Sequence, residues 1–176
     1  MDLAKTIRDV PDFPKKGILF KDVTTLFRDA EAFRALIDGM DAELTQRGVE
    51  FDLVAAPEAR GFAIGAALAY KRGTGFVPVR KPGKLPAKTI ARAYALEYGE
   101  GTLEMHEDAI APGQRVLVID DILATGGTAL AACELIQALG GLVAAVRFAV
   151  ELKGLGGREA LTGYDVDALL SFEVDE

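Results

Sequence analysis

The chain has 176 residues, half of them hydrophobic, and a net charge of −7 at pH 7. This length suits one domain spanning residues 1–176, and no run approaches the roughly 18 apolar residues that a membrane-spanning helix needs. The acidic balance argues against a nucleic-acid binder.

A single cysteine, Cys133, excludes an internal disulfide, and the N-terminus lacks the apolar stretch of a secretory signal, so we expect a cytoplasmic protein. The only histidine, His106, disfavours a zinc site of the usual His/Cys type.

In chain order, helical patterns alternate with apolar runs that resemble strands. Helices are predicted over residues 2–10, 29–47, 61–73, 126–139 and 156–163. Strands are predicted over residues 51–57, 75–81, 115–120, 142–152 and 165–173, and a hairpin over 94–99 and 101–108. Residues 81–89 form a predicted loop. Pro78 weakens the strand at 75–81. This alternation is typical of an α/β domain with a mainly parallel sheet. Tyr70, Phe76 and Cys133 are expected in the core.

The segment VLVIDDILATGGT, residues 116–128, combines a buried strand with two adjacent acids and a small-residue loop. Asp120 and Asp121 would be costly to bury together unless a ligand or cation compensates them. The alternative is a solvated turn at the end of a strand. In a parallel sheet, ligands bind at the carboxyl ends of strands, and a helix N-terminus that follows favours a phosphate. The lysine of a Walker loop is missing. The order of acids and then phosphate loop suits a phosphorylated sugar.

Basic residues are unevenly distributed along the chain. Eight of the 20 lie between Arg60 and Arg92, where there is no acid, so the remaining 12 share the rest of the chain with all 27 acids. Such a run is either a solvated face or a site for a small anionic ligand.

The 116–128 segment resembles the phosphoribosyl pyrophosphate motif of the type I phosphoribosyltransferases. Four more segments, FPKKGILFKDVT, EARGF, VPVRKPGKLP and YALEYG, occur in the same order as in the members of this family that use adenine. The resemblance runs from Phe13 to the C-terminus. It implies a twisted, mainly parallel sheet flanked by helices, a small N-terminal hood in which residues 1–28 take part, and a flexible loop over residues 80–98.

The resemblance also implies a reaction and its ligands. Adenine and phosphoribosyl pyrophosphate would give AMP and pyrophosphate in purine salvage, with Mg²⁺ carried by the substrate rather than bound directly by the protein. Members of this family are usually homodimers. Neither a nucleic-acid partner nor a membrane is expected.

Site residues are carried over position by position. For the ribose hydroxyls and the 5-phosphate the resemblance implies Asp120, Asp121, Ala124, Thr125, Gly126, Gly127 and Thr128. For pyrophosphate it implies Glu58, Ala59, Arg60, Arg80, Lys81 and Lys84, with a non-trans peptide bond at Glu58–Ala59 and basic residues that act in their own subunit or across a dimer. For the base it implies Phe20 as a stacking ring, the backbone of Leu19 and Lys21, and Ile122. Glu97 would be the general acid/base, with Tyr98 beside it in the loop.

Two alternatives are less consistent with these residues. Hypoxanthine-guanine members resemble this chain but have an aspartate at the position of Ala124, and orotate members lack the LATGG pattern. A regulator that kept the site and lost catalysis would usually carry an added DNA-binding domain, for which 176 residues leave no room. Many adenine-using members have arginine at the position of Lys21. Because the expected contact there is made by the main chain, we expect base recognition to survive this change.

Overall fold

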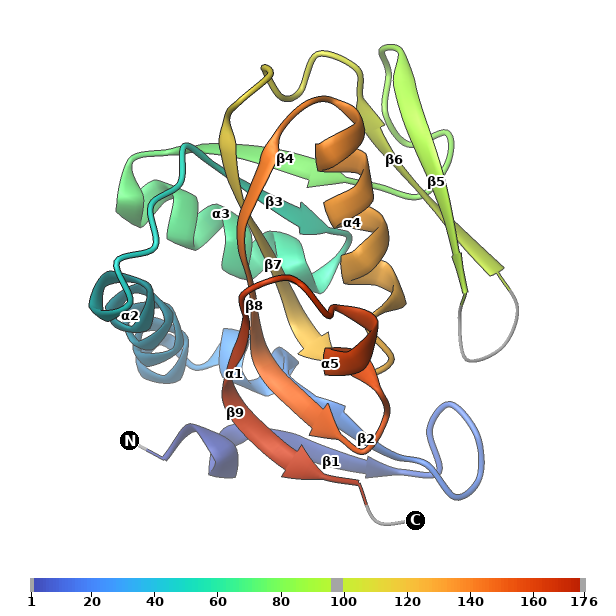
Figure 1. The fold of residues 1–176 in the computed structure, drawn as a ribbon. Coiled ribbons are helices and arrows are strands. Elements are labelled where there is room, and N and C mark those ends of the chain that lie inside the picture. The colour runs from blue at the N-terminus through green and yellow to red at the C-terminus, as the bar shows by residue number, and fades with distance from the viewer. Residues whose placement is uncertain (1, 96–99, 175–176) are drawn as a thin grey trace.

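A five-stranded sheet forms the centre of the computed structural model, which describes residues 2–95 and 100–174 (Figure 1). Its order is β4-β3-β7-β8-β9, and every neighbouring pair is parallel. The strands are β3 (Leu53–Pro57), β4 (Gly75–Val79), β7 (Arg115–Leu123), β8 (Leu142–Lys153) and β9 (Val166–Glu173). The prediction of an α/β domain with a mainly parallel sheet is confirmed.

Helices cover both faces of this sheet, so the central strands are buried on both sides. The helices α2 (Ala30–Gln46) and α3 (Arg60–Arg72) lie on one face, and α4 (Gly127–Ala138) lies on the other (Figure 1). In β7, Leu117 and Ile119 pack into the core on the α2 and α3 side, whereas Val116 and Val118 pack with α4. Burial on two faces explains the unbroken apolar run that precedes the acids.

Local signals in the sequence set the helix ends. The Asp29 side chain accepts hydrogen bonds from the N–H groups of Glu31 and Ala32 at the start of α2, at 3.0 and 2.9 Å. Gly73, with φ at 66°, ends α3 in the left-handed conformation. Both helices therefore begin and end within one residue of the predicted positions.

The strand containing Pro78 is an edge strand. β4 pairs only with β3 in the sheet, so one side of its backbone needs no ladder hydrogen bond and the missing N–H of Pro78 is tolerated.

The N-terminal segment differs from the prediction of a helix over residues 2–10. It contains a short 3₁₀ turn, η1 (Leu3–Thr6), and then β1 (Arg8–Pro11), which pairs antiparallel with β2 (Leu19–Asp22). A short helix, α1 (Thr24–Arg28), was not predicted. The reason is tertiary: β1 is stabilised by β2, and Arg8 donates to Asp22 across the pair. The part of residues 1–28 that the structure describes is therefore a two-stranded ribbon with a short helix, and its role as a hood stays a prediction.

A pair of antiparallel strands lies over α4, and the first of them falls within the predicted flexible segment 80–98. The strands are β5 (Thr89–Ala95), which begins five residues before the predicted 94–99, and β6 (Glu100–His106), which lies within two residues of the predicted 101–108. The predicted flexible segment 80–98 thus contains a strand, and its flexibility stays a prediction. Arg92 on β5 forms an ion pair with Glu134 on α4, with 3.1 Å between Nε and Oε2.

Two of the three expected core residues pack as predicted, at least in part. Cys133 is fully buried. Phe76 is half-buried and packs edge-on against Phe62. Tyr70 is 90 % exposed, so its prediction as a core residue is wrong. It lies on α3, whose apolar stripe is carried by smaller residues such as Ile64 and Leu68.

Candidate functional site

A cavity of about 380 Å³ lies at the carboxyl ends of the central strands. Four parts of the chain line it: β2, the turn after β3, the end of β7 and the beginning of α4. Phe148 and Leu152 of β8 complete the apolar side. The volume lies within the range of about 300–1,000 Å³ that is usual for small-molecule sites.

The acid pair lies within β7 rather than after it, because the strand continues to Leu123. Asp121 is only 4 % exposed, and Arg60, the first residue of α3, donates its Nε–H to Oδ2 of this carboxylate. Asp120 Oδ1 accepts the backbone N–H of Asp121 at 2.8 Å. The pair is therefore not a solvated turn, since both acids line the cavity and one of them has a guanidinium partner.

Burial gives Asp120 an unusual protonation equilibrium. Desolvation, reinforced by the neighbouring charge of Asp121, raises the pKa of Asp120 well above its ordinary value, and the Arg60 charge offsets only part of this effect. A ligand that donates hydrogen bonds or brings a cation would stabilise the charged form. Perturbed carboxylates of this kind are concentrated at functional sites.

The loop that follows β7 leads into a helix N-terminus with free backbone donors. Gly126, the N-cap of α4, adopts φ of 83°, and no side chain caps the helix. Its carbonyl accepts the N–H of Leu130 at 2.9 Å, which is the first turn of the helix. The N–H groups at the start of α4, beginning at Gly127, thus lack a capping side chain beside the cavity. Such groups and the positive end of the helix dipole form a phosphate site.

The turn after β3 contains the predicted unusual bond. The Glu58–Ala59 peptide bond is cis. Glu58 accepts the Nε–H of Arg80 at 2.7 Å and the backbone N–H of Lys81 at 3.1 Å. Burial alone would raise the pKa of Glu58, but these hydrogen bonds and the Arg80 charge outweigh it, so its pKa is lowered. Glu58 thereby connects this turn to the segment that follows β4.

The strand β2 contributes an aromatic ring, Phe20, to the lining of the cavity. Phe20 packs edge-on against Phe13 at 5.1 Å between ring centroids, and the Arg60 guanidinium lies 5.9 Å from the Phe20 centroid. The Lys21 side chain is engaged elsewhere: Nζ donates to Asp9 at 2.7 Å and lies 4.5 Å from the Phe172 ring centroid. Only the backbone of Lys21 is thus left for a ligand in the cavity.

Comparison with known proteins gives one consistent result. A model described as "Phosphoribosyl transferase domain" matches residues 24–173. The chain belongs to the phosphoribosyl transferase family.

Relatives within this family match the chain over nearly its whole length. It is 57 % identical to adenine phosphoribosyltransferase of Thermotoga neapolitana over 172 residues, which is 98 % of this chain and 100 % of the relative. A crystal structure of the adenine phosphoribosyltransferase of Thermoanaerobacter pseudethanolicus is 54 % identical, with a TM-score of 0.94 over 97 % of this chain and 98 % of that one. The Saccharomyces cerevisiae enzyme, complexed with an imino-altritol bisphosphate and adenine, is 40 % identical, with a TM-score of 0.91 over 96 % and 97 %.

The cavity collects most of the residues expected from the phosphoribosyl transferase resemblance. They are Leu19, Phe20, Lys21, Glu58, Ala59, Arg60, Lys81, Asp120, Asp121, Ile122, Ala124, Thr125, Gly126, Gly127 and Thr128. Arg80 and Lys84 are not among its lining residues. Arg80 instead binds Glu58 and the carbonyl of Lys84, the latter at 3.2 Å. Glu97 and Tyr98 lie outside the described residues.

The basic run between Arg60 and Arg92 is not one pyrophosphate-facing surface. Lys71 and Arg72, at the end of α3, pair with acids of α2, where Lys71 Nζ lies 2.8 Å from Asp38 Oδ1. Only Arg60 and Lys81 of the run line the cavity. The run is therefore divided between the two alternatives: one part pairs with acids at the surface and another part lines the cavity. A helix end next to an acidic helix accounts for much of the local charge.

Two cavity features of this phosphoribosyl transferase were not identified from the sequence. A Cβ at Gly61 would lie 2.9 Å from Asp120 Oδ1 and 3.2 Å from the Ile119 carbonyl oxygen, so only glycine fits beside the acid pair. Tyr94, on β5, also lines the cavity, and its ring covers Gly101 of β6. The EARGF segment contained a signal for Gly61, whereas nothing in the local sequence distinguishes Tyr94 from a core residue.

Proposed function

We propose that the protein transfers the 5-phosphoribosyl group of phosphoribosyl pyrophosphate to adenine, giving AMP and pyrophosphate in purine salvage. The observation that carries this proposal is one continuous cavity that joins an aromatic face, an acid pair and a helix N-terminus without a capping side chain. These three parts match the base, the ribose and the 5-phosphate of a nucleotide. The adenine named in the yeast relative's complex supports the assignment of the base.

The ribose 5-phosphate end would use the acid pair and the loop 124–128. The carboxylates of Asp120 and Asp121 accept hydrogen bonds from the two ribose hydroxyls, and the hydroxyls of Thr125 and Thr128 add donors to the backbone N–H groups of the loop. Ribose hydroxyls at Asp120 would offset the cost of burying its charge.

The pyrophosphate would lie on the side of Arg60 and Lys81. In the described contacts Arg60 uses its Nε for Asp121, which leaves its terminal amino groups for phosphate oxygens. Glu58 holds Arg80 and the Lys81 backbone, so it orients the basic segment beside the turn. Arg80 and Lys84 act on pyrophosphate either after a rearrangement of their own subunit or across a homodimer. Light scattering in solution tests the homodimer, which follows from the resemblance to the family.

The base would stack on Phe20, with Ile122 beside it, and be read by the backbone of β2. In the described part of the chain, β2 pairs only with β1, so part of its backbone hydrogen-bonding capacity is not used by a sheet. The Leu19 carbonyl accepts from the 6-amino group of adenine, and the Lys21 N–H donates to ring N1. A 6-oxo purine carries an acceptor at position 6 and a donor at ring N1, so it would leave the Leu19 carbonyl and the Lys21 N–H without hydrogen-bond partners.

Between the two substrates, Glu97 would serve as the general acid/base, with Tyr98 next to it in the sequence. The incoming ring nitrogen of adenine must lose a proton as the bond to the sugar forms, and a carboxylate near the purine can accept it. Tyr94, which lines the cavity, is three residues from Glu97 along the chain. The segment 80–98 would close over the bound substrates and exclude water.

Magnesium would enter with the substrate. Among residues 2–95 and 100–174, no group of three His, Cys, Asp or Glu side chains is arranged to hold a metal ion. The acid pair beside the cavity and the raised pKa of Asp120 suit a cation carried on phosphate oxygens. The ion would neutralise charge on the pyrophosphate.

The part of the chain that the structure describes holds no helix that is long and apolar enough to cross a bilayer. We place the reaction in the cytoplasm, with no nucleic-acid or membrane partner.

A panel of purine bases tests the proposal. Nucleotide and pyrophosphate formation would be measured with adenine, hypoxanthine and guanine at saturating phosphoribosyl pyrophosphate. Each unpaired group costs about 1–3 kcal/mol, so two mismatches predict a preference for adenine of at least about a hundredfold in kcat/KM. Comparable values for hypoxanthine and adenine would contradict the assignment of the base, and absence of pyrophosphate with every base would contradict the reaction.

A further inference from the structure

The phosphate loop, residues 124–128, lies directly against the short helix α5 (Gly157–Ala160). A Cβ at Gly126 would lie 2.8 Å from the Gly157 carbonyl oxygen and 3.1 Å from Ala160 Cβ. A Cβ at Gly157 would clash with the Ala124 carbonyl oxygen and would lie 2.7 Å from Leu123 Cδ1. Two glycines therefore allow the loop and the helix to approach more closely than side chains permit. Gly157 is buried, and its φ is not in the left-handed region, so this contact rather than backbone strain requires glycine.

An ion pair holds α5 in place. Arg158 donates Nε–H and Nη2–H to the two carboxylate oxygens of Glu151, both at 2.7 Å, and Nη1–H to the Val166 carbonyl at 2.9 Å. Glu151, on β8, is only 7 % exposed. A bidentate pair of this kind fixes orientation as well as distance. One arginine thus ties the helix to β8 and to β9.

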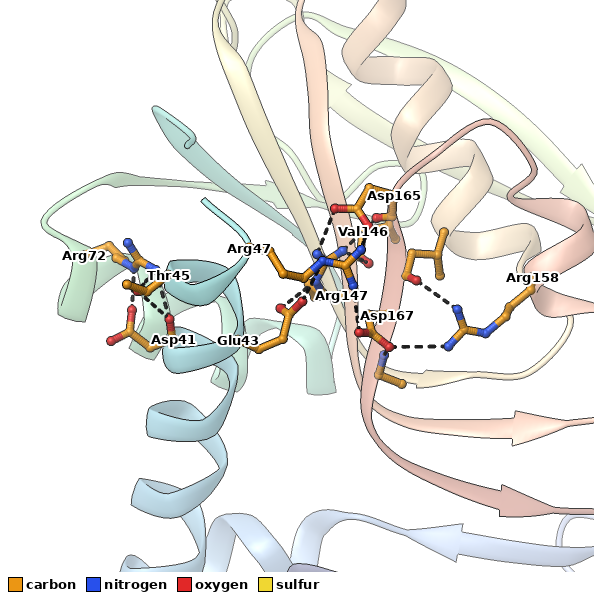
Figure 2. Close-up of polar contacts among 12 residues, drawn as sticks. Asp41, Glu43, Thr45, Arg47, Arg72, Val146, Arg147, Arg158, Asp165 and Asp167 are labelled. Carbon is orange, nitrogen blue, oxygen red and sulfur yellow. Dashed lines mark hydrogen bonds and ion pairs between the residues drawn. The ribbon is translucent and has the colours of Figure 1, made fainter. Parts of the chain in front are cut away.

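The attachment continues through a polar network to α2 (Figure 2). Asp167 accepts from Arg47 at 3.0 Å and lies 3.5 Å from Arg158 Nη2. Arg147, on β8 and 2 % exposed, donates to Glu43 at 2.8 Å and to Asp165 at 2.9 Å. Figure 2 shows these side chains between the C-terminal end of α2 and the strands β8 and β9, with Arg158 of α5 at one edge of the network. The helix behind the phosphate loop is thereby connected to the body of the domain.

We propose that α5 is a positioning element for the 5-phosphate, with Gly157 setting the position of the Ala124 carbonyl and Arg158 holding the helix against β8. This inference rests on the proposed function, because it concerns the same phosphate. Neither residue lines the cavity. They act on the ligand through the loop, whose backbone donors must keep their distance from the phosphate oxygens.

A methyl group at residue 157 would clash with the Ala124 carbonyl and displace the loop that is proposed to hold the phosphate. Misplacement by about 1 Å costs as much as about a hundredfold in rate or binding. We expect Gly157→Ala to raise the Kd for ribose 5-phosphate and for AMP at least about tenfold, with a matching rise in the KM for phosphoribosyl pyrophosphate. The KM for adenine at saturating phosphoribosyl pyrophosphate should change less than about threefold. Arg158→Gln, which loosens the helix without a clash, should act in the same direction and more weakly.

Gly154→Ala is the matched control. Gly154 is exposed in the turn before α5, with φ of 90° and no atom within 4 Å of a built Cβ. Alanine there strains the backbone without touching the phosphate loop, so it should lower the melting temperature and leave the Kd for ribose 5-phosphate unchanged. A general loss of stability would lower the fraction of active protein. It would not raise the KM for phosphoribosyl pyrophosphate more than the KM for adenine.

Isothermal calorimetry with ribose 5-phosphate and AMP, together with steady-state kinetics, decides the matter. The proposal is overturned if folded Gly157→Ala binds ribose 5-phosphate as the parent does, or if adenine and phosphate affinities fall in equal proportion. Should Gly157→Ala not fold, an unchanged Kd in Arg158→Gln overturns it, and a selective rise supports it. A parent protein that binds neither ribose 5-phosphate nor AMP would instead contradict the proposed function.

Discussion

The loop 124–128, which is proposed to bind the phosphate, follows a strand with neighbours on both sides. The segment β2, which is proposed to bind the base, belongs to a two-stranded ribbon and has one neighbour. β7 lies between β3 and β8, and Asp121 at its end is 4 % exposed. β2 pairs only with β1 in the described chain, and Leu19 is 52 % exposed. One end of the cavity is thus formed before a ligand arrives, and the other leaves much of its surface for the base to cover. Substitutions at the first end should affect every phosphorylated ligand, and those at the second only the base.

The largest effect is expected at the phosphate end, from Gly127→Val. Gly127 begins α4 and lines the cavity, so an isopropyl group there takes the space of the phosphate and blocks the helix N-terminus. AMP binding should become unmeasurable by calorimetry. Ala138→Val adds the same group at the exposed last residue of α4 and should leave the Kd unchanged. A folded Gly127→Val protein with normal AMP affinity would contradict the phosphate assignment.

Glu97→Gln should lower the rate of the chemical step while leaving ligand binding at both ends of the cavity largely unchanged. We expect kcat to fall by about 10²–10⁴, with a much smaller change in the KM for phosphoribosyl pyrophosphate, because general acid/base catalysis typically contributes that much. Glu100→Gln, at the start of β6, is the matched control and should retain the parent's kcat. Steady-state rates within threefold of the parent would remove Glu97 from the mechanism.

Asp120→Asn should weaken binding and at the same time stabilise the free protein. Loss of charge-assisted hydrogen bonds to the ribose costs about 1.5–3 kcal/mol each, so the Kd for AMP should rise about ten- to a hundredfold. The pKa of Asp120 in the folded protein lies above its unfolded value of about 3.9, so the folded state binds more protons between these two values. Parent stability therefore falls as the pH rises from about 4 through the raised pKa, and the variant lacks this loss.

Urea unfolding of both proteins at pH 4 and pH 7 measures this difference, which should favour the variant more at pH 7. Asp108→Asn, at an exposed position after β6, should show neither effect. Equal AMP affinity in parent and Asp120→Asn would mean that the acid is structural.

Phe20→Ala tests the base end. Stacking contributes about 1–3 kcal/mol per base and does not distinguish purines, so kcat/KM should fall for adenine and hypoxanthine alike while the preference persists. The Kd for ribose 5-phosphate should not change. Phe13→Ala removes the ring that packs on Phe20 without lining the cavity and should have a weaker effect. A change in the adenine preference itself would contradict recognition through the backbone.

The smallest effect is expected from Lys21→Met. The Lys21 side chain binds Asp9 and lies over Phe172, so its loss loosens the ribbon while the backbone that reads the base remains. A partly exposed ion pair contributes about 0.2–1 kcal/mol, so the KM for adenine should rise less than about fivefold. A hundredfold rise in the steady-state KM would show that the ammonium group itself contacts the ligand.

The two ends also differ in how far the sequence predicted them. At the phosphate end, the strand, the acids and the helix N-terminus are contiguous in the chain. The pattern of residues 116–128 was therefore enough to predict that a strand carrying the acids leads into a helix. At the base end, the segment predicted as a helix over residues 2–10 contains a short 3₁₀ turn and then a strand, because β1 depends on pairing with β2. The roles of Arg80 and Lys84 were implied by the family resemblance, whereas the structure pairs Arg80 with Glu58, 22 residues away.

By itself, the sequence determined the parallel α/β order, the ends of α2 and α3, and the succession of acids and phosphate loop in β7 and α4. Each of these features depends on residues that are close together in the sequence, within one helical turn or one strand. Only the tertiary structure decided that Arg60 binds Asp121, that Gly61 must leave room for Asp120, and that α5 lies against the phosphate loop. These contacts join segments that are distant in the chain. Side-chain volume and charge select them only after the sheet has brought those segments together.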